Sequence, residues 1–104
     1  VLKYYSNVFN ATRIVFANAI YEICQHLGAD YEKIKDTYLI RGTASPDYLD
    51  VNDKLRGYGG MCLPKDTKAL DALTKQLGLD LKLFETIDAD NQKFKRTVFP
   101  GMRP

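Results

Sequence analysis

The chain is poor in cysteine, histidine and net charge, and each shortage argues against a class of protein. Cys24 and Cys62 are the only cysteines, too few for a disulfide framework, so we expect a reducing, cytoplasmic setting. His26 is the only histidine, and without clustered cysteines beside it a metal site is not expected. A net charge of +2 over 104 residues argues against nucleic acid or a membrane surface as the partner.

Long apolar runs and phosphate-binding glycine motifs are also missing. No apolar run approaches the roughly 18 residues that a membrane span needs, and no signal peptide pattern opens the chain. No Gly-x-Gly-x-x-Gly follows a strand, so the chain alone is not expected to bind a dinucleotide in the usual way. Because it begins at Val1, directly in a helical pattern, we expect it to be an excised piece of a longer protein.

What the chain does contain is helical periodicity. From about Leu2 to Leu27, apolar residues recur at spacings of three and four with no Pro or Gly between them, and Gly28 suits the residue that ends a helix. The residues of this apolar stripe are Tyr5, Val8, Phe9, Thr12, Val15, Phe16, Ala19, Ile20 and Ile23. A helix this long and apolar usually packs against more than one neighbour, and a second copy of the chain is a candidate.

Three further helices are predicted, separated by a long polar loop. Their expected bounds are Asp30 (the N-cap) to Ile40, Pro64 to Leu77, and Leu79 to about Val98. Their expected inward residues are Ala69, Leu70, Leu73 and Leu77, then Leu81, Leu83, Phe84, Ile87 and Phe94. Residues 43–54 read as a loop with a short turn at Asp47–Leu49. With no strand pattern, residues 1–104 are predicted to form one all-α domain of about four helices with a long N-terminal helix.

The most informative stretch of the chain is Gly57-Tyr58-Gly59-Gly60-Met61-Cys62-Leu63-Pro64-Lys65-Asp66. Its glycines permit close approach of the backbone to a ligand. Cys62 is expected just ahead of a helix N-terminus with Lys65 nearby, and both features favour the thiolate, which is the nucleophilic form. Asp66 suits the positive end of the same helix. The alternative is a purely structural turn, with Cys62 a small buried hydrophobe as we expect for Cys24.

Polar residues on the first helix form a second candidate group. Lys3 and Asn7 are four residues apart and share a face, and Asn10 and Asn18 lie on roughly the same side. Amides can direct hydrogen bonds at an oxygen without adding charge. The alternative is that this stripe is an ordinary solvated face.

These two groups, taken in order, resemble a known family. Lys3-x-x-x-Asn7, followed by Gly57 to Asp66, is similar to the central domain of the nucleotide-sugar dehydrogenases, the UDP-glucose/GDP-mannose dehydrogenase family. The stretch Leu27-Gly28-Ala29-Asp30-Tyr31 matches the family's usual helix connection, and the similarity covers essentially the whole chain. It implies the fold of the central domain of 6-phosphogluconate-dehydrogenase-like enzymes, a homodimer formed through the first helix, and NAD-binding and nucleotide-sugar-binding domains outside this chain.

The resemblance also implies roles for single residues. Cys62 would be the nucleophile that captures an aldehyde intermediate, and Asp66 would help to activate water for thioester hydrolysis. Lys3 and Asn7 would stabilise the oxyanion. The other implied contacts are Gly59 with the sugar, Tyr48 and Leu49 with the substrate nucleotide, and Lys65 with the NAD cofactor.

One segment departs from the family pattern. The stretch from Asp50 to Arg56 is longer and more charged than in many members, and the arginine that reaches a neighbouring subunit's substrate has only Arg41 as a suggested counterpart.

The activity implied is oxidation of a sugar primary alcohol to a carboxylate in two NAD-dependent steps, with UDP-glucose as the first choice of substrate. A UDP-N-acetylhexosamine or GDP-mannose substrate is the alternative, and a non-catalytic helical dimerisation module is the rival from another class. This chain by itself is expected to be inactive.

Overall fold

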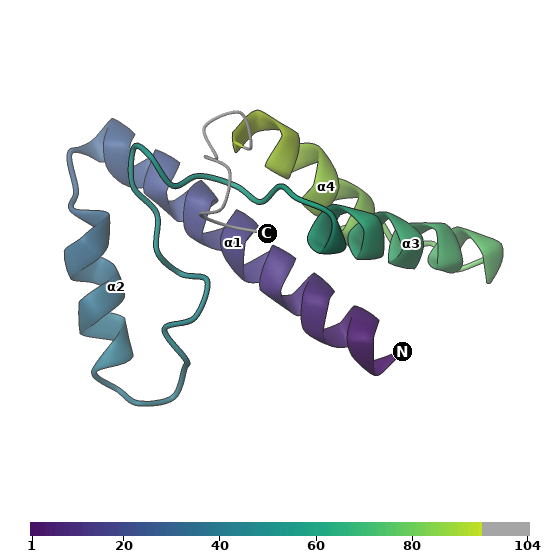
Figure 1. The fold of residues 1–104 in the computed structure, drawn as a ribbon. Coiled ribbons are helices and arrows are strands. Elements are labelled where there is room, and N and C mark those ends of the chain that lie inside the picture. The colour runs from purple at the N-terminus through teal and green to yellow at the C-terminus, as the bar shows by residue number, and fades with distance from the viewer. Residues whose placement is uncertain (95–104) are drawn as a thin grey trace.

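The computed structural model describes residues 1–94, which form four helices, and the predicted all-α class is confirmed (Figure 1). The helices are α1 (Leu2–Leu27), α2 (Tyr31–Leu39), α3 (Cys62–Gln76) and α4 (Leu83–Phe94). α3 and α4 lie side by side and both pack on α1, whereas α2 turns back from the C-terminal end of α1 at an angle and contacts it much less. The predicted end of the last helix near Val98, and everything after it, falls outside the described residues.

The first two helices begin and end where the sequence predicts. Gly28 ends α1 with a left-handed backbone (φ 70°), and the N–H groups of Gly28 and Ala29 both donate to the carbonyl of Cys24. The side chain of Asp30 then accepts a hydrogen bond from the N–H of Lys33 at 3.3 Å and caps α2. The short turn at Asp47–Leu49 is also present, closed by a bond from the Leu49 N–H to the Pro46 carbonyl.

Most of the large residues in the apolar stripe of α1 are not buried within the described part of the chain. Tyr5, Phe9, Phe16 and Ile23 are 71%, 52%, 63% and 53% exposed. The buried residues of the helix are Val8, Ala11, Ile14, Val15, Ala17, Asn18, Tyr21 and Cys24. Small residues such as Ala11 and Ala17 let other parts of the chain approach the helix closely, which apolar spacing alone does not register. α1 therefore carries two apolar faces, one of which is left uncovered within residues 1–94.

α3 and α4 begin at different places from those predicted. α3 starts at Cys62, so Cys62 is the first helical residue, Asp66 lies beyond the first turn, and Pro64 falls within that turn. α4 starts at Leu83, after residues 79–82 that have no regular secondary structure, and the carbonyl of Lys82 accepts the N–H of Thr86. The expected inward positions Leu77, Leu81 and Leu83 are 62%, 49% and 56% exposed. The buried positions of the two helices are Leu63, Asp66, Thr67 and Thr74, then Ile87, Asn91 and Phe94.

The core consists of two clusters along α1. The first holds Tyr58 and joins α1 to α3 and α4. The second holds Cys24, which is buried as predicted, together with residues of α2 and the loop. The members of the first cluster are Ala11, Ile14, Val15, Tyr58, Leu63, Ile87 and Phe94. Tyr58 thus anchors the glycine-rich stretch at the point where the two longest helices, α1 and α3, meet.

The charged segment before the glycine stretch is tied to α1 by Arg56. Its Nε donates to Asn18 Oδ1 at 2.7 Å, its terminal nitrogen pairs with the carboxylate of Glu22, and its guanidinium lies 4.9 Å from the centre of the Tyr21 ring. Tyr21 in turn donates its hydroxyl to Asp53 at 2.6 Å, and this bond is the main reason that the pKa of Tyr21 is raised. The charged side chains of this segment therefore serve to dock the loop.

A buried lysine on α2 holds the same loop further upstream. Lys35 is only 9% exposed and pairs with Asp50 and Glu32. Burial by itself would lower the pKa of Lys35, but the bonds to these carboxylates outweigh it, so the pKa lies above its usual value.

Candidate active site at the junction of α1 and α3

The two sequence motifs meet through a hydrogen bond between α1 and α3. Asn7 Nδ2 donates to Asp66 Oδ2 at 2.7 Å across 59 residues of sequence. Asp66 is fully buried, and its second oxygen, Oδ1, has no hydrogen-bond partner among the described residues. A buried carboxylate oxygen without a donor is costly, so this atom is suited to accept a hydrogen bond from a molecule that enters the site.

Two lysines stand beside this pair. Lys3 lies one turn before Asn7 on α1, and Lys65 precedes Asp66 on α3. Lys3, Lys65 and Asp66 line one hollow of about 530 Å³ together with Val1, Tyr4 and Ala69. The structure therefore brings four predicted site residues together, with two cations and one carboxylate around a single space.

Cys62 is an exposed free thiol at the first position of α3. It lies four residues before Asp66, so the thiol and the carboxylate share a face of the helix. The N-cap position, Met61, makes no side-chain hydrogen bond to the helix, so the backbone N–H groups of the first turn are not capped in that way. Such a helix start presents partial positive charge beside the thiol.

Within the glycine turn, Gly59 differs from Gly57 and Gly60 in its backbone conformation. Gly57 and Gly60 have φ of 49° and 77°, conformations that favour glycine. Gly59 has no positive φ, and a Cβ placed on it would meet nothing within 4 Å in the described chain. Neither the backbone nor internal packing requires a glycine there, and the space in front of it is open.

Tyr48 and Leu49 are not part of the hollow lined by Lys3, Lys65 and Asp66. Tyr48 takes a left-handed backbone (φ 65°) and packs its ring on the first core cluster, with the Arg13 guanidinium 5.5 Å from the ring centre. The carbonyl of Leu49 accepts the Tyr31 hydroxyl at 2.7 Å. Neither residue lines the hollow at Lys3. Arg41 is exposed at the end of α2 beside the Tyr38 ring, also outside that hollow.

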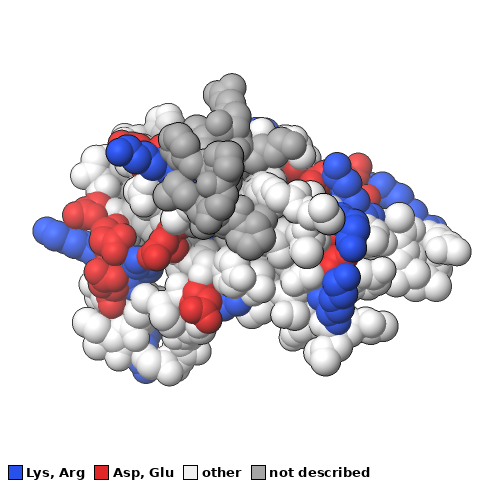
Figure 2. Space-filling view, viewed as in Figure 1, with Lys and Arg blue, Asp and Glu red and all other residues white. Residues whose placement is uncertain are grey.

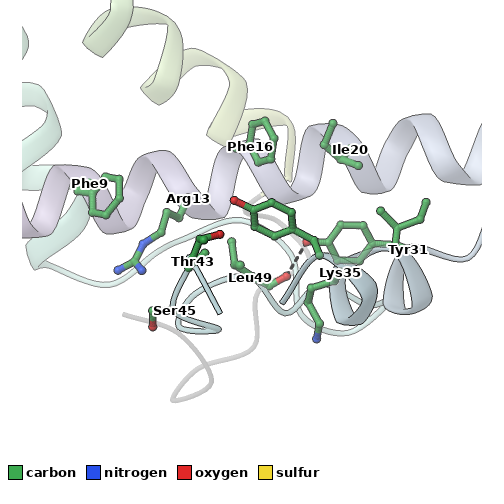
Figure 3. A pocket seen from close by; sticks show the side chains of 12 residues that line it. Phe9, Arg13, Phe16, Ile20, Tyr31, Lys35, Thr43, Ser45 and Leu49 are labelled. Carbon is green, nitrogen blue, oxygen red and sulfur yellow. Dashed lines mark hydrogen bonds between the residues drawn. The ribbon is translucent and has the colours of Figure 1, made fainter. Parts of the chain in front are cut away.

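Leu49 instead lines a larger, mainly apolar groove of about 700 Å³ between α1, α2 and the loop. Figure 3 shows Phe9, Arg13, Phe16 and Ile20 of α1 along one side of this groove and Tyr31 of α2 opposite them. Phe9 and Phe16 belong to the uncovered face of α1.

One residue close to the site escaped the sequence reasoning. Asn91 of α4 is 1% exposed and binds both backbone groups of Tyr58, accepting its N–H at 2.7 Å and donating to its carbonyl at 2.8 Å. The available signal was its place at helical spacing between the buried Ile87 and Phe94. The Tyr58 side chain is itself fully buried, and burial, with Asp88 nearby, raises the pKa of Tyr58 to about 12.

The described part of the chain shows neither a metal-binding cluster nor a helix that could span a membrane. Among the described residues no group of three His, Cys, Asp or Glu side chains is placed to hold a metal ion. None of the helices described in residues 1–94 combines the length and hydropathy required to cross a bilayer. On the face in Figure 2, basic side chains stand beside acidic ones toward both ends of the molecule.

Sequence comparison identifies the class of domain in which this helical junction occurs. A sequence model of the UDP-glucose/GDP-mannose dehydrogenase family, central domain, matches residues 1–93. The chain therefore belongs to this family and is a central domain of it, as the resemblance predicted.

Several relatives are UDP-glucose 6-dehydrogenases. The chain is 38% identical to TuaD of Bacillus subtilis over 93 residues, which cover 89% of this chain and 20% of TuaD. It is 36% identical to YwqF of the same organism over 87 residues, covering 84% of this chain and 19% of YwqF. It is 33% identical to the Pseudomonas aeruginosa enzyme over 99 residues, covering 93% of this chain and 21% of that enzyme. The chain thus spans about a fifth of the length of these relatives.

Proposed function

We propose that this chain is the catalytic-cysteine domain of a UDP-glucose 6-dehydrogenase, in which the sugar C6 alcohol is oxidised to a carboxylate to give UDP-glucuronate. The observation that carries the proposal is the Asn7–Asp66 hydrogen bond, because it brings the two family motifs into one site with Lys3. UDP-glucose is chosen over other nucleotide sugars because the three relatives described above are named for it.

The central step is addition of the Cys62 thiolate to an aldehyde formed in the first oxidation. A sulfur–carbon bond forms, and the electron pair of the carbonyl bond moves to oxygen. Lys3 offers a positive charge to that oxygen, and Asn7 offers an N–H, since its amide has two and gives only one to Asp66. The oxidised form of this adduct is a thioester on Cys62.

Asp66 is placed to assist hydrolysis of the thioester. Its Oδ1 is the buried oxygen without a partner among the described residues, and it can accept a proton from a water molecule. As the water oxygen bonds to the carbonyl carbon, the carbon–sulfur bond breaks and the thiolate is regenerated. Asn7 holds the other oxygen of Asp66, which orients the carboxylate for this role.

Lys65 and Gly59 complete the proposed site. Lys65 is exposed and lines the hollow beside Lys3, so it is accessible to the cofactor, NAD⁺, from within this domain. NAD⁺ supplies the hydride acceptor for both oxidations, and we assign its main binding site to a domain outside this chain. The open space in front of Gly59 supports close approach of the sugar, which a side chain would obstruct. Tyr48 and Leu49 are proposed to contact the nucleotide from the loop.

The assay of this function uses the full-length protein with NAD⁺ and UDP-glucose, UDP-N-acetylglucosamine or GDP-mannose. We expect UDP-glucose to give the highest kcat/KM, with two NADH formed per molecule of acid. A higher kcat/KM for another nucleotide sugar would change the proposed substrate and leave the proposed thioester mechanism unchanged. If no nucleotide sugar were oxidised, and Cys62 also proved inert to mild alkylation, the non-catalytic module would be the better account.

We also propose that the chain forms a homodimer in the cytoplasm through the uncovered face of α1. Phe9, Phe16 and Ile23 lie exposed along that face, which borders the groove in Figure 3. A second copy presents the same apolar face, so pairing would remove both from water. Both cysteines are free thiols, which suits a reducing compartment.

Phe16→Asp should therefore convert the dimer to a monomer. Burying an unpaired carboxylate in an apolar interface is costly, whereas in the monomer the side chain already faces water. Light scattering at micromolar concentration measures the mass. Leu77→Asp is the matched control, because Leu77 is 62% exposed against 63% for Phe16 but lies at the end of α3. A monomeric mass for the unsubstituted chain, or dimers of both variants, would contradict the proposed interface.

A further inference from the structure

The glycine turn is held at one point by a side chain from α4. Asn91 Oδ1 accepts the N–H of Tyr58 at 2.7 Å, and Asn91 Nδ2 donates to the Tyr58 carbonyl at 2.8 Å. The two residues are 1% and 0% exposed, so water does not compete for these bonds. One amide therefore satisfies both backbone groups of a residue 33 positions away.

Tyr58 lies between two glycines with left-handed backbone conformations. Gly57 comes directly before Tyr58 and Gly60 two residues after it, and glycine reaches such conformations at little cost. The Tyr58 side chain is packed in the core cluster that contains Ile87 of α4. The two hydrogen bonds from the Asn91 side chain fix the direction of the backbone at Tyr58, and thereby the path of the residues that follow.

Those residues carry the proposed chemistry. Gly59 comes directly after Tyr58, and Cys62 begins α3 four residues after it. The thiol must lie within attack distance of the aldehyde carbon for the second oxidation, whereas the first oxidation makes no use of sulfur. A misplacement of about 1 Å in a reacting group can cost about 10²-fold in rate.

We propose that Asn91 is a positioning residue for the second oxidation: by holding the backbone of Tyr58 it sets the glycine turn so that Cys62 meets the aldehyde before the aldehyde escapes. This inference rests on the proposed dehydrogenase function. Asn91 acts through Tyr58 and the turn.

The test compares Asn91→Leu with Ile87→Val in the full-length enzyme supplied with UDP-glucose and NAD⁺. Leucine is close to asparagine in size and removes both hydrogen bonds. Ile87 lies one turn earlier on α4 in the same core, so Ile87→Val loosens packing and leaves the amide in place. The readout is the fraction of product recovered as aldehyde, trapped by hydroxylamine, relative to acid.

This ratio does not depend on how much enzyme is folded, so a merely structural role would leave it unchanged. We expect Asn91→Leu to raise the aldehyde fraction about tenfold or more, because capture by the thiol slows while the first oxidation continues. Ile87→Val should keep the ratio of the unsubstituted enzyme. If Asn91→Leu does not fold, Asn91→Asp carries the test, since it keeps the acceptor for the Tyr58 N–H and loses the donor to its carbonyl.

The outcomes separate the two proposals. An aldehyde fraction in the Asn91 variant equal to that of Ile87→Val would overturn the positioning role, even if the enzyme makes acid and depends on Cys62. No acid from the unsubstituted enzyme with any nucleotide sugar would instead defeat the proposed function on which this inference rests.

Discussion

Cys62→Ala in the full-length enzyme is expected to abolish formation of the sugar acid. Without the thiol no covalent adduct can form on the aldehyde, so the second oxidation has no substrate in reacting position. The first oxidation needs no sulfur, so NADH production coupled to aldehyde release should persist. Product analysis of trapped aldehyde and of acid, alongside NADH absorbance, measures both steps.

Cys24→Ala is the matched control. Cys24 is 3% exposed and lies in the second core cluster, remote from the glycine turn. Its truncation should lower the free energy of unfolding by about 1–2 kcal/mol and leave turnover per folded molecule intact. If Cys62→Ala made acid at the normal rate, the thiol mechanism would be wrong, and the turn would be better explained as purely structural.

Asp66→Asn should block hydrolysis of the thioester and leave Cys62 acylated. The amide oxygen can still accept the bond from Asn7, so the shape of the site is kept, but the side chain can no longer accept a proton from water. Acid formation should fall roughly 10²- to 10⁴-fold, the usual contribution of a general base. Because Cys62 is unchanged, one equivalent of thioester should build up before turnover stalls.

Asp71→Asn separates this effect from the loss of any carboxylate on α3. Asp71 lies on the same helix and also has one buried oxygen without a partner among the described residues, while its other oxygen accepts a hydrogen bond from Lys75 Nζ at 3.0 Å. It does not line the hollow at Lys3. We expect its variant to turn over normally, and equal slowing of both variants would count against a specific role for Asp66.

The sequence predicted the helices best where local signals end them. α1 contains no Pro or Gly and stops at Gly28, and Asp30 caps the next helix, so both could be placed from the sequence. The predicted start of the last helix was wrong because the leucines at 79, 81 and 83 indicate a helix, although α4 begins only at Leu83. The apolar spacing of α1 did not show which face is buried, because small residues, Ala11 and Ala17, lie in the core while large ones such as Phe16 remain outside.

The candidate site, like the helices, could be predicted from the sequence where local spacing decides and not where contacts between distant residues decide. The spacing of Lys3 and Asn7 already places them on one face, but their meeting with Asp66 depends on how α1 packs on α3. Asn91 and Arg56 were missed because a polar residue in a helix or loop ordinarily faces solvent, and only the fold shows that each is bonded inside. The sequence thus predicted the candidate reacting groups, whose roles remain proposals, and missed the residues that hold the loop and the glycine turn in place.

The thioester mechanism is tested most directly by mass spectrometry of the Asp66→Asn enzyme after incubation with UDP-glucose and NAD⁺. We expect one added nucleotide-sugar acyl group per subunit, located on the peptide that contains Cys62 and removed by hydroxylamine. An unmodified protein that still makes acid slowly, or an acyl group on any residue other than Cys62, would contradict this mechanism.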